Sequence, residues 1–501
     1  MKEYTIFDLQ KKMQAGKLSA RKLVSKYLDR IEMIDRNGAR LNSIIELNPD
    51  AMNIASVLDR ERDSGSIRGP LHGIPILIKD NIDTADKMQT TAGSLALEGN
   101  HAKQDAGLVE KLRAAGVIIL GKTNLSEWAN FRGKNSTSGW SSRGGLTHNP
   151  YALDRSACGS SSGSGAAVAA NLATVAVGTE TDGSIICPSQ TNGIVGIKPT
   201  IGLVSRSGII PISHSQDTAG PMARTVADAA ILLGAMAGFD GRDPATKAGV
   251  RRGFTDYTPF LDVNGLKGAR IGIARTLFGT DKKILQIMES SLGAMKQAGA
   301  TLIDVEIKPS DEFGKTEIEV LLYEFKEGLN AYLASAKPKT GVRSLADVIR
   351  FNEENHKQVM PYFGQERMEQ AQSRGGLKSR KYLSALKKNH RLARTEGVNM
   401  VMSKYRLDAI VCPSGGAAWV IDLVNGDGFS SWDMDSTSYS SVAGTPHITV
   451  PAGFIFGLPV GISFFAKAWQ EPKLIKLAYA FEQLTQIRKP PLFLQTADLG
   501  L

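Results

Sequence analysis

The chain has 501 residues, of which 42% are hydrophobic and 22% charged, a composition typical of a globular protein with a substantial core. Its net charge is +10, from 60 basic and 50 acidic residues. No nucleic-acid motif accompanies this charge, and the basic residues do not alternate with aromatics as in a stacking groove, so we expect no nucleic-acid partner. No apolar run reaches the roughly 18 residues of a membrane span, so we expect no membrane contact.

The three cysteines, Cys158, Cys187 and Cys412, do not have the spacing of a metal site, and we expect neither a metal nor a cofactor. Their odd number argues against a complete disulfide framework. Cys187 follows Ser-Ile-Ile and precedes Pro, so we predict a small buried hydrophobe there. The first residues lack the apolar core of a signal peptide, which favours a cytoplasmic location, although export with a removed signal stays open. The sequence leaves the oligomeric state unknown.

Residues 1–68 predict an N-terminal helical segment, in which no residue suggests a catalytic role. Thr5 and Ser19 are plausible N-caps of two successive helices, which end near Gly16 and Gly38. A third, charged helix is predicted over 51–68, where Gly and Pro follow it.

Residues 69–230 are predicted to form the core of the protein. The runs GIPILIKD (73–80) and VIILGKTN (117–124) predict buried strands, with a helix over 105–115 between them. A long polar loop follows, and because such loops in compact domains tend to be functional, Ser136 is a candidate for substrate binding. Beyond residue 189 we predict two strands, a turn and a helix: GIVGIKP, GLVSRSG, GPMAR and TVADAAILLGAMAG.

The rest of the chain alternates between strand and helix patterns. Strands are predicted at 268–274, 407–414 and 447–454, and a closing helix near Pro472. Residues 282–406 have long, charged helical patterns and predict a helical layer over the site. The alternation predicts an α/β fold in which helices sandwich a mixed central β-sheet, as one compact domain over residues 1–501.

The most informative stretch runs from Cys158 to Ser189, CGSSSGSGAAVAANLATVAVGTETDGSIICPS. Hydroxyl-rich ends enclose a small, apolar segment, whose side chains let backbones approach closely. A flexible linker has no need of such an apolar segment, so the pattern predicts a buried polar site.

These residues resemble the signature of the amidase signature family, serine hydrolases that cleave amides with a Ser-Ser-Lys triad. The resemblance extends over nearly the whole chain and includes GIPILIKDNID, GKTNLSEWANF, QDTAGPMART, and the runs at 159–161 and 178–185. It implies the family's fold, with Ser184 as nucleophile, Ser160 as proton relay after a cis peptide bond, and Lys79 as base. It also implies an oxyanion hole made by the backbone N–H groups of Thr181, Asp182, Gly183 and Ser184.

Within the family, the chain is similar to the peptide amidases, which remove the C-terminal amide nitrogen of peptide amides. The similarity lies in Cys158, Glu180 and Asp182, whereas many members have Gly at positions 158 and 182. The expected partner is therefore a peptide or small-molecule amide. These departures from the family pattern could alter how the 181–184 backbone is held.

The residue types suit amide hydrolysis, which needs an activated nucleophile, a proton for the departing nitrogen and donors for the oxyanion. His72 and His447 lie within matching motifs, but neither occupies the position of the family's base. Lys79 is the remaining candidate. Free lysine has a pKa of about 10.4, so the amine must be held neutral by burial.

Other functions remain as alternatives. Gly159–Gly163 also matches the G-x-S-x-G elbow of α/β-hydrolases, with Ser161 as nucleophile and His72-Gly73 mimicking their oxyanion motif, but that elbow needs a strand directly before it. A phosphate-binding role is weak because no P-loop motif is present. Within the family, the alternatives are a general small-amide amidase and the glutamine-amidase subunit of a tRNA-dependent amidotransferase, which needs partner chains.

Overall fold

The central feature of the fold is one mixed β-sheet. The computed structural model describes residues 1–307, 311–427 and 437–500, and in this part of the chain eleven strands join in the order β1-β3-β2-β6-β8-β7-β12-β13-β11-β9-β10. Its strands are β1 Ile44–Leu47, β2 Pro75–Lys79, β3 Ile118–Thr123, β6 Val175–Glu180, β7 Val195–Lys198, β8 Thr218–Ala223, β9 Arg270–Ala274, β10 Thr301–Val305, β11 Ala409–Pro413, β12 His447–Ile455 and β13 Leu458–Phe465. A two-stranded ribbon joins β4 Trp140–Ser141 and β5 Gly145–Leu146.

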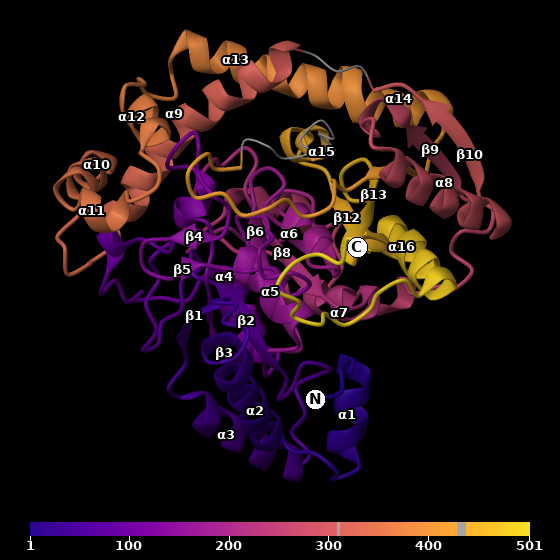
Figure 1. Cartoon of the computed structure of the whole chain (residues 1–501), viewed down its shortest axis with the longest axis horizontal. Coiled ribbons are helices and arrows are strands. Elements are labelled where there is room, and N and C mark those ends of the chain that lie inside the picture. The colour runs from indigo at the N-terminus through magenta and orange to yellow at the C-terminus, as the bar shows by residue number, and fades with distance from the viewer. Residues whose placement is uncertain (308–310, 428–436, 501) are drawn as a thin grey trace.

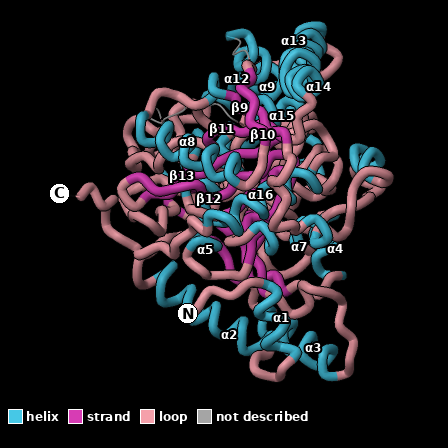
Figure 2. Tube along the Cα trace, turned by 90° about the vertical axis from the view of Figure 1, so that its right-hand side faces the viewer, coloured by secondary structure: helices cyan, strands magenta, loops and turns pink. Residues whose placement is uncertain are grey.

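Helices flank this sheet in a single domain, which confirms the predicted fold class. Figure 2 shows the strands running through the middle of the molecule with helices around them. The α-helices are α1 Ile6–Gln14, α2 Ala20–Arg30, α3 Ala51–Asp63, α4 Gly107–Ala114, α5 Ser162–Ala169, α6 Ile186–Thr191, α7 Val226–Met236, α8 Lys282–Gln297, α9 Asp311–Ser335, α10 Leu345–Glu354, α11 His356–Val359, α12 Glu366–Gln372, α13 Arg380–His390, α14 Asn399–Tyr405, α15 Ser438–Ala443 and α16 Glu471–Thr485. Shorter 3₁₀ and π turns are η1 Ile31–Arg36, η2 Leu95–Leu97, η3 Glu127–Asn130, η4 Pro244–Gly249, η5 Thr258–Phe260, η6 Arg275–Leu277 and η7 Arg391–Val398.

The first helices begin where their caps predict. The Thr5 side chain accepts a hydrogen bond from the N–H of Asp8, and the Asp8 carboxylate accepts one from the N–H of Thr5, which satisfies two otherwise unpaired donors of α1. Ser19 caps α2 in the same way, accepting from the N–H of Lys22. The third helix ends at Asp63, five residues before its predicted end, because Gly65 adopts a left-handed conformation with φ of 82°.

Three local predictions in the middle of the chain are wrong. The run 202–208 is not a strand, since Gly202 and Gly208 at its ends have φ of 87° and 73° and break the extended conformation. Residues 220–223, predicted as a turn, belong to β8. Gly220 allows this because the Ile197 carbonyl comes so close that a Cβ would lie 2.0 Å from it. The region 282–406, predicted to be a helical layer, is not entirely helical, because it also contains the strand β10.

The arrangement of β2 and β6 determines where the candidate site lies. The two strands are parallel neighbours, with Ile76 opposite Val175 and Ile78 opposite Val177. Because the carboxyl ends of parallel neighbours meet at the same edge of a sheet, the residues that end β2 and β6 come together there. Figure 1 shows α9, α12 and α13 as an arch over this part of the molecule, with α15 beneath it.

The segment boundaries predicted at residues 68, 230 and 282 stay predictions. None of the helices within residues 1–307, 311–427 and 437–500 combines the length and apolar character that crossing a membrane requires.

Candidate active site

Lys79 lies at the centre of the site, at the last position of β2, with no exposed surface. Its Nζ lies 2.7 Å from Ser160 Oγ, 3.0 Å from Ser161 Oγ and 2.9 Å from Thr179 Oγ1. The structure thus brings together two of the residues predicted from the sequence, Lys79 and Ser160. The bond between Gly159 and Ser160 is cis, as the family resemblance implied.

The hydrogen bonds around Ser161 indicate which of its contacts the Lys79 amine makes as a donor. The Ser161 hydroxyl donates to the Thr179 carbonyl, 3.1 Å away, and accepts from the Thr179 N–H, 3.2 Å away. Since a hydroxyl has one hydrogen to donate, Ser161 must accept from Lys79. Nζ also lies 3.3 Å from the Thr179 carbonyl, so Ser161 and Thr179 offer acceptors for both N–H bonds of a neutral amine. The one lone pair of that amine can then accept from the Ser160 hydroxyl.

The same contacts weigh against Ser161 as a nucleophile. Its side chain is completely buried, and the one hydrogen of its hydroxyl is donated to the Thr179 carbonyl. The residues directly before it form turns and isolated bridges, whereas the hydrolase elbow requires a strand. Gly178 is needed for this packing, because a Cβ there would lie 2.8 Å from Ser161 Oγ.

Burial lowers the pKa of the Lys79 amine to about 7, and the carboxylates of Glu180 and Asp217 partly oppose that shift. At pH 7 an unperturbed lysine is neutral in only about one molecule in 2,500, given a pKa of about 10.4. A pKa near 7 makes the neutral amine a major species. A pKa in this range fits the role of base that the sequence predicts for Lys79.

Ser184 lies in the turn that follows β6. Ser184 is 8% exposed, whereas Lys79 and Ser160 have no exposed surface, so Ser184 is the most accessible of the three residues. The N–H of Ser161 donates to the Ser184 carbonyl at 3.3 Å, which brings the two serine loops together. No hydrogen bond among the described residues joins the Ser160 and Ser184 hydroxyls, so the relay contact stays a prediction.

Glu180 holds this turn in place. One carboxylate oxygen accepts the N–H groups of Ile185 and Ile186, at 2.7 and 2.9 Å. Gly183 adopts φ of 75°, which favours glycine, and its carbonyl accepts the N–H of Cys187 at 2.8 Å. The predicted oxyanion residues 181–184 therefore form a fixed turn at the carboxyl end of β6. Sequence reasoning placed Glu180 in the motif but gave it no role.

A cavity of about 420 Å³ borders the site, and Asn81, Thr179 and Thr181 form part of its wall. The Asn81 amide donates to Thr179 Oγ1 at 3.0 Å, so the cavity reaches a hydroxyl that contacts Lys79 directly. Asp217, also in its wall, accepts from the Thr181 hydroxyl at 2.5 Å, and burial raises its pKa to about 6.

Ser136, the predicted substrate-binding residue, lies apart from these contacts. Its hydroxyl donates to Asn130 Oδ1 at 2.7 Å, and its carbonyl accepts the N–H of Asp427 at 3.2 Å. None of its hydrogen bonds within the described residues involves Lys79, Ser160 or Ser184. A role in substrate binding stays a prediction.

The two histidines in the matching motifs make structural hydrogen bonds away from Lys79. The buried ring of His447 lies between the hydroxyls of Ser440 and Ser463, and burial lowers its pKa to about 3. One ring nitrogen of His72 lies 2.9 Å from the carbonyl of Leu58. These positions leave Lys79 as the base candidate beside the serines.

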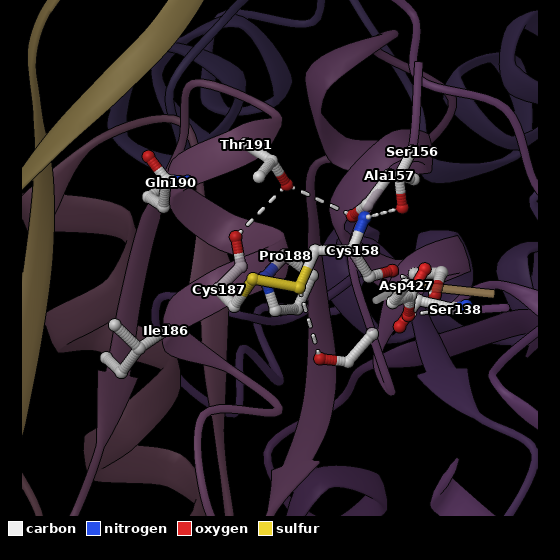
Figure 3. Close-up of a disulfide and its surroundings, with 12 residues drawn as sticks. Ser138, Ser156, Ala157, Cys158, Ile186, Cys187, Pro188, Gln190, Thr191 and Asp427 are labelled. Atoms are coloured by element: carbon white, nitrogen blue, oxygen red, sulfur yellow. Dashed lines mark hydrogen bonds between the residues drawn. A yellow bond between two sulfur atoms is a disulfide. The ribbon is translucent and has the colours of Figure 1, made fainter. Parts of the chain in front are cut away.

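Cys158 and Cys187 form a disulfide and Cys187 is only half-buried, so the prediction of a small buried hydrophobe at Cys187 is wrong. Figure 3 shows the bridge, with Thr191 donating to the carbonyls of Ala157 and Cys187 beside it. An odd cysteine count does not exclude one bridge, and the 29-residue separation carries no signal of pairing. The bridge joins the residue before Gly159 to α6, which follows Ser184. Disulfides persist in oxidising compartments, and the compartment of this chain stays a prediction.

Comparison with known proteins agrees with this geometry. The Amidase family model matches residues 22–475. The chain is 42% identical to a probable amidase of Arabidopsis thaliana, with 99% of this chain and 92% of that protein covered. It is 34% identical to a glutamyl-tRNA(Gln) amidotransferase subunit from Pseudomonas syringae, over 97% of this chain and 98% of that one. The solved peptide amidase of Stenotrophomonas maltophilia is 52% identical, with a TM-score of 0.93 and coverage of 98% and 99%.

The chain therefore belongs to the Amidase family, and it is an amide hydrolase whose structure is close to that of peptide amidase. The predicted family, fold and general activity are confirmed.

Removing the disulfide should destabilise the protein. Replacing both cysteines, Cys158→Ala with Cys187→Ala, frees a 29-residue loop in the unfolded chain. Loop-closure entropy predicts a loss of about 3.5 kcal/mol in the free energy of unfolding, measured by denaturant titration. A reductant should destabilise the native protein similarly and leave the double variant unchanged. Equal stability of native protein and variant would show that the bridge contributes nothing.

Proposed function

We propose that this enzyme removes the amide nitrogen from the C-terminal carboxamide of peptides, with Ser184 as nucleophile, Ser160 as proton relay and Lys79 as base. The observation that carries the proposal is the contact of 2.7 Å between Ser160 Oγ and the Nζ of a completely buried lysine. A pKa of about 7 and a lone pair left for Ser160 give Lys79 the properties of a general base.

In the proposed acylation step, Ser184 Oγ attacks the carbonyl carbon of the amide. Its proton passes to Ser160 while the Ser160 proton passes to Lys79, so that the lysine becomes charged. The tetrahedral intermediate then breaks its C–N bond. The proton returns from Lys79 through Ser160 to the nitrogen, which leaves as ammonia. Water next attacks the acyl-enzyme by the same route, releasing the carboxylic acid and restoring Ser184.

Negative charge on the carbonyl oxygen needs donors during both steps. The proposed donors are the backbone N–H groups of Thr181, Asp182, Gly183 and Ser184. The turn is held by Glu180 before any substrate arrives, and preorganised donors are the kind that stabilise a transition state most.

The choice of peptide amides as substrates rests on two supports. The first is the 52% identity with solved peptide amidase along nearly the whole chain. The second is steric: Figure 1 shows α9, α12 and α13 above the middle of the molecule, and we propose that this helical layer and the loop around 128–150 close one end of the substrate cleft. Such a cleft admits a chain end carrying –NH2 but not residues beyond the scissile bond. The amidotransferase relatives favour glutamine as the second candidate substrate.

Ser184→Ala should lower kcat by at least about 10⁴-fold, because the variant lacks the nucleophile. An electrophilic serine reagent should label Ser184 in the native enzyme, as found by peptide mass mapping. Ser161→Ala serves as the control and should still be labelled at Ser184. Labelling of Ser161 in the native enzyme would show that the wrong serine has been chosen.

Lys79→Ala should be nearly as damaging, since groups that act as a unit are not additive. Only the neutral amine can accept a proton, so the native rate should rise with pH and reach half its maximum near pH 7, where the lysine loses its proton. Steady-state rates between pH 5 and 9, spanning about two units each side of that midpoint, measure this. A variant with more than about a tenth of native activity would remove Lys79 from its role as base.

The substrate class is tested with one peptide supplied both as the C-terminal amide and as the free acid. Mass spectrometry should show a gain of about 1 Da in the amide alone, because NH2 is replaced by OH, with internal peptide bonds intact. A parallel reaction with free glutamine under the same conditions tests glutamine as the second candidate substrate. Internal cleavage, or turnover of glutamine or short aliphatic amides alone, would contradict the proposal.

A further inference from the structure

Helix α15 and its N-cap residue Thr437 contact two acidic side chains near Ser184, those of Asp182 and Glu180. The Thr437 hydroxyl donates to one oxygen of the Asp182 carboxylate at 2.6 Å, and the Ser438 hydroxyl donates to the other. One turn further along the helix, the Ser441 hydroxyl donates to Glu180 at 3.2 Å. These contacts join residues more than 250 positions apart in the chain.

The helix that makes these contacts is itself anchored to the sheet. Ser440, on α15, lies 2.9 Å from one ring nitrogen of His447 in β12, whose other nitrogen lies 2.5 Å from Ser463 in β13. Each member of this chain is completely buried. Thr437, the N-cap residue of the helix, also lies against the turn, since a Cβ on Gly183 would be 3.3 Å from Thr437 Oγ1. A fixed element therefore contacts the proposed oxyanion residues.

Asp182 could affect the reaction through its negative charge or through the position that it gives the turn, and the sign of the charge separates these two roles. A carboxylate next to a developing oxyanion repels it, so the charge alone would slow the reaction. A contribution to the rate must then come from position. The hydroxyls of Thr437 and Ser438, at the start of α15, hold the carboxylate and, through it, the backbone of the turn.

We propose that Asp182 is a positioning residue, which fixes the oxyanion turn against α15 through Thr437 and Ser438. The proposal rests on the proposed oxyanion hole. A glycine at this position would have no side chain to make the contact, so the contact depends on the acidic side chain of Asp182.

Asp182→Ala removes both contacts and should lower kcat about 10- to 100-fold, up to the usual effect of losing one oxyanion donor. KM should change by less than about 3-fold, because the donors act in the transition state. Asp182→Asn should keep most of the activity, since an amide can pair with two hydroxyls that each donate or accept. Unfolding midpoints of all variants are measured alongside, and the substrate is whichever amide the native enzyme hydrolyses fastest.

The same contacts can be removed from the other side by Thr437→Val with Ser438→Ala. This pair should also lower kcat, and the loss on combining it with Asp182→Ala should be smaller than the sum of the two separate losses. Both changes break the contacts that Thr437 and Ser438 make with Asp182. The pair also keeps the test valid if Asp182→Ala does not fold.

Glu180→Gln is the matched control, because its carboxylate raises the pKa of Lys79 whereas Asp182 has no part in that shift. Glu180→Gln should therefore move the acid limb of the pH–rate profile to lower pH. Asp182→Ala should leave that limb where it is and lower only the plateau.

An unchanged or higher kcat in Asp182→Ala would overturn the proposal, since it would leave charge as the residue's main effect. Fully additive losses, or a fall in kcat explained by a lower unfolding midpoint, would do the same. Failure of the proposed function would show differently. Lys79→Ala would then stay active, or peptide amides would not be hydrolysed, whatever the result at Asp182.

Discussion

The burial of one amine is the constraint on which the site depends. Lys79 lies at the end of an apolar strand with no exposed surface, and loss of hydration lowers its pKa to about 7. The hydroxyls of Ser160, Ser161 and Thr179 satisfy its hydrogen bonds without adding charge. A carboxylate in direct contact would keep the lysine protonated, so a shell of hydroxyls is what allows a neutral base.

The rest of the fold positions the other residues of the site around that amine. Parallel pairing of β2 and β6 brings Thr179 beside Lys79, and Glu180 holds the following turn by two backbone N–H groups. The Cys158–Cys187 bridge joins the loop of Ser160 to the helix after Ser184. Strand ends, a carboxylate, a disulfide and α15 thus act on the same few residues, as a rigid site for acyl transfer requires.

The parts of this arrangement that could be predicted were those written in short stretches of sequence. The apolar run ending in Lys79, the caps Thr5 and Ser19 and the signature around Ser160 and Ser184 each carry a local pattern. Features that depend on distant parts of the chain could not be predicted. Cys158 gives no sign of its partner, the Gly-Pro of β8 is typical of a turn, and the contact of Asp182 with α15 exists only once the sheet has formed.

The most direct test of the account is a titration of Lys79 itself, in protein containing ¹³C-labelled lysine with the resonance assigned by the Lys79→Ala variant. The chemical shift should change with a midpoint near pH 7, the value that burial gives this amine. A midpoint near the pKa of free lysine, about 10.4, would mean that the amine is charged at neutral pH and would contradict its role as the base.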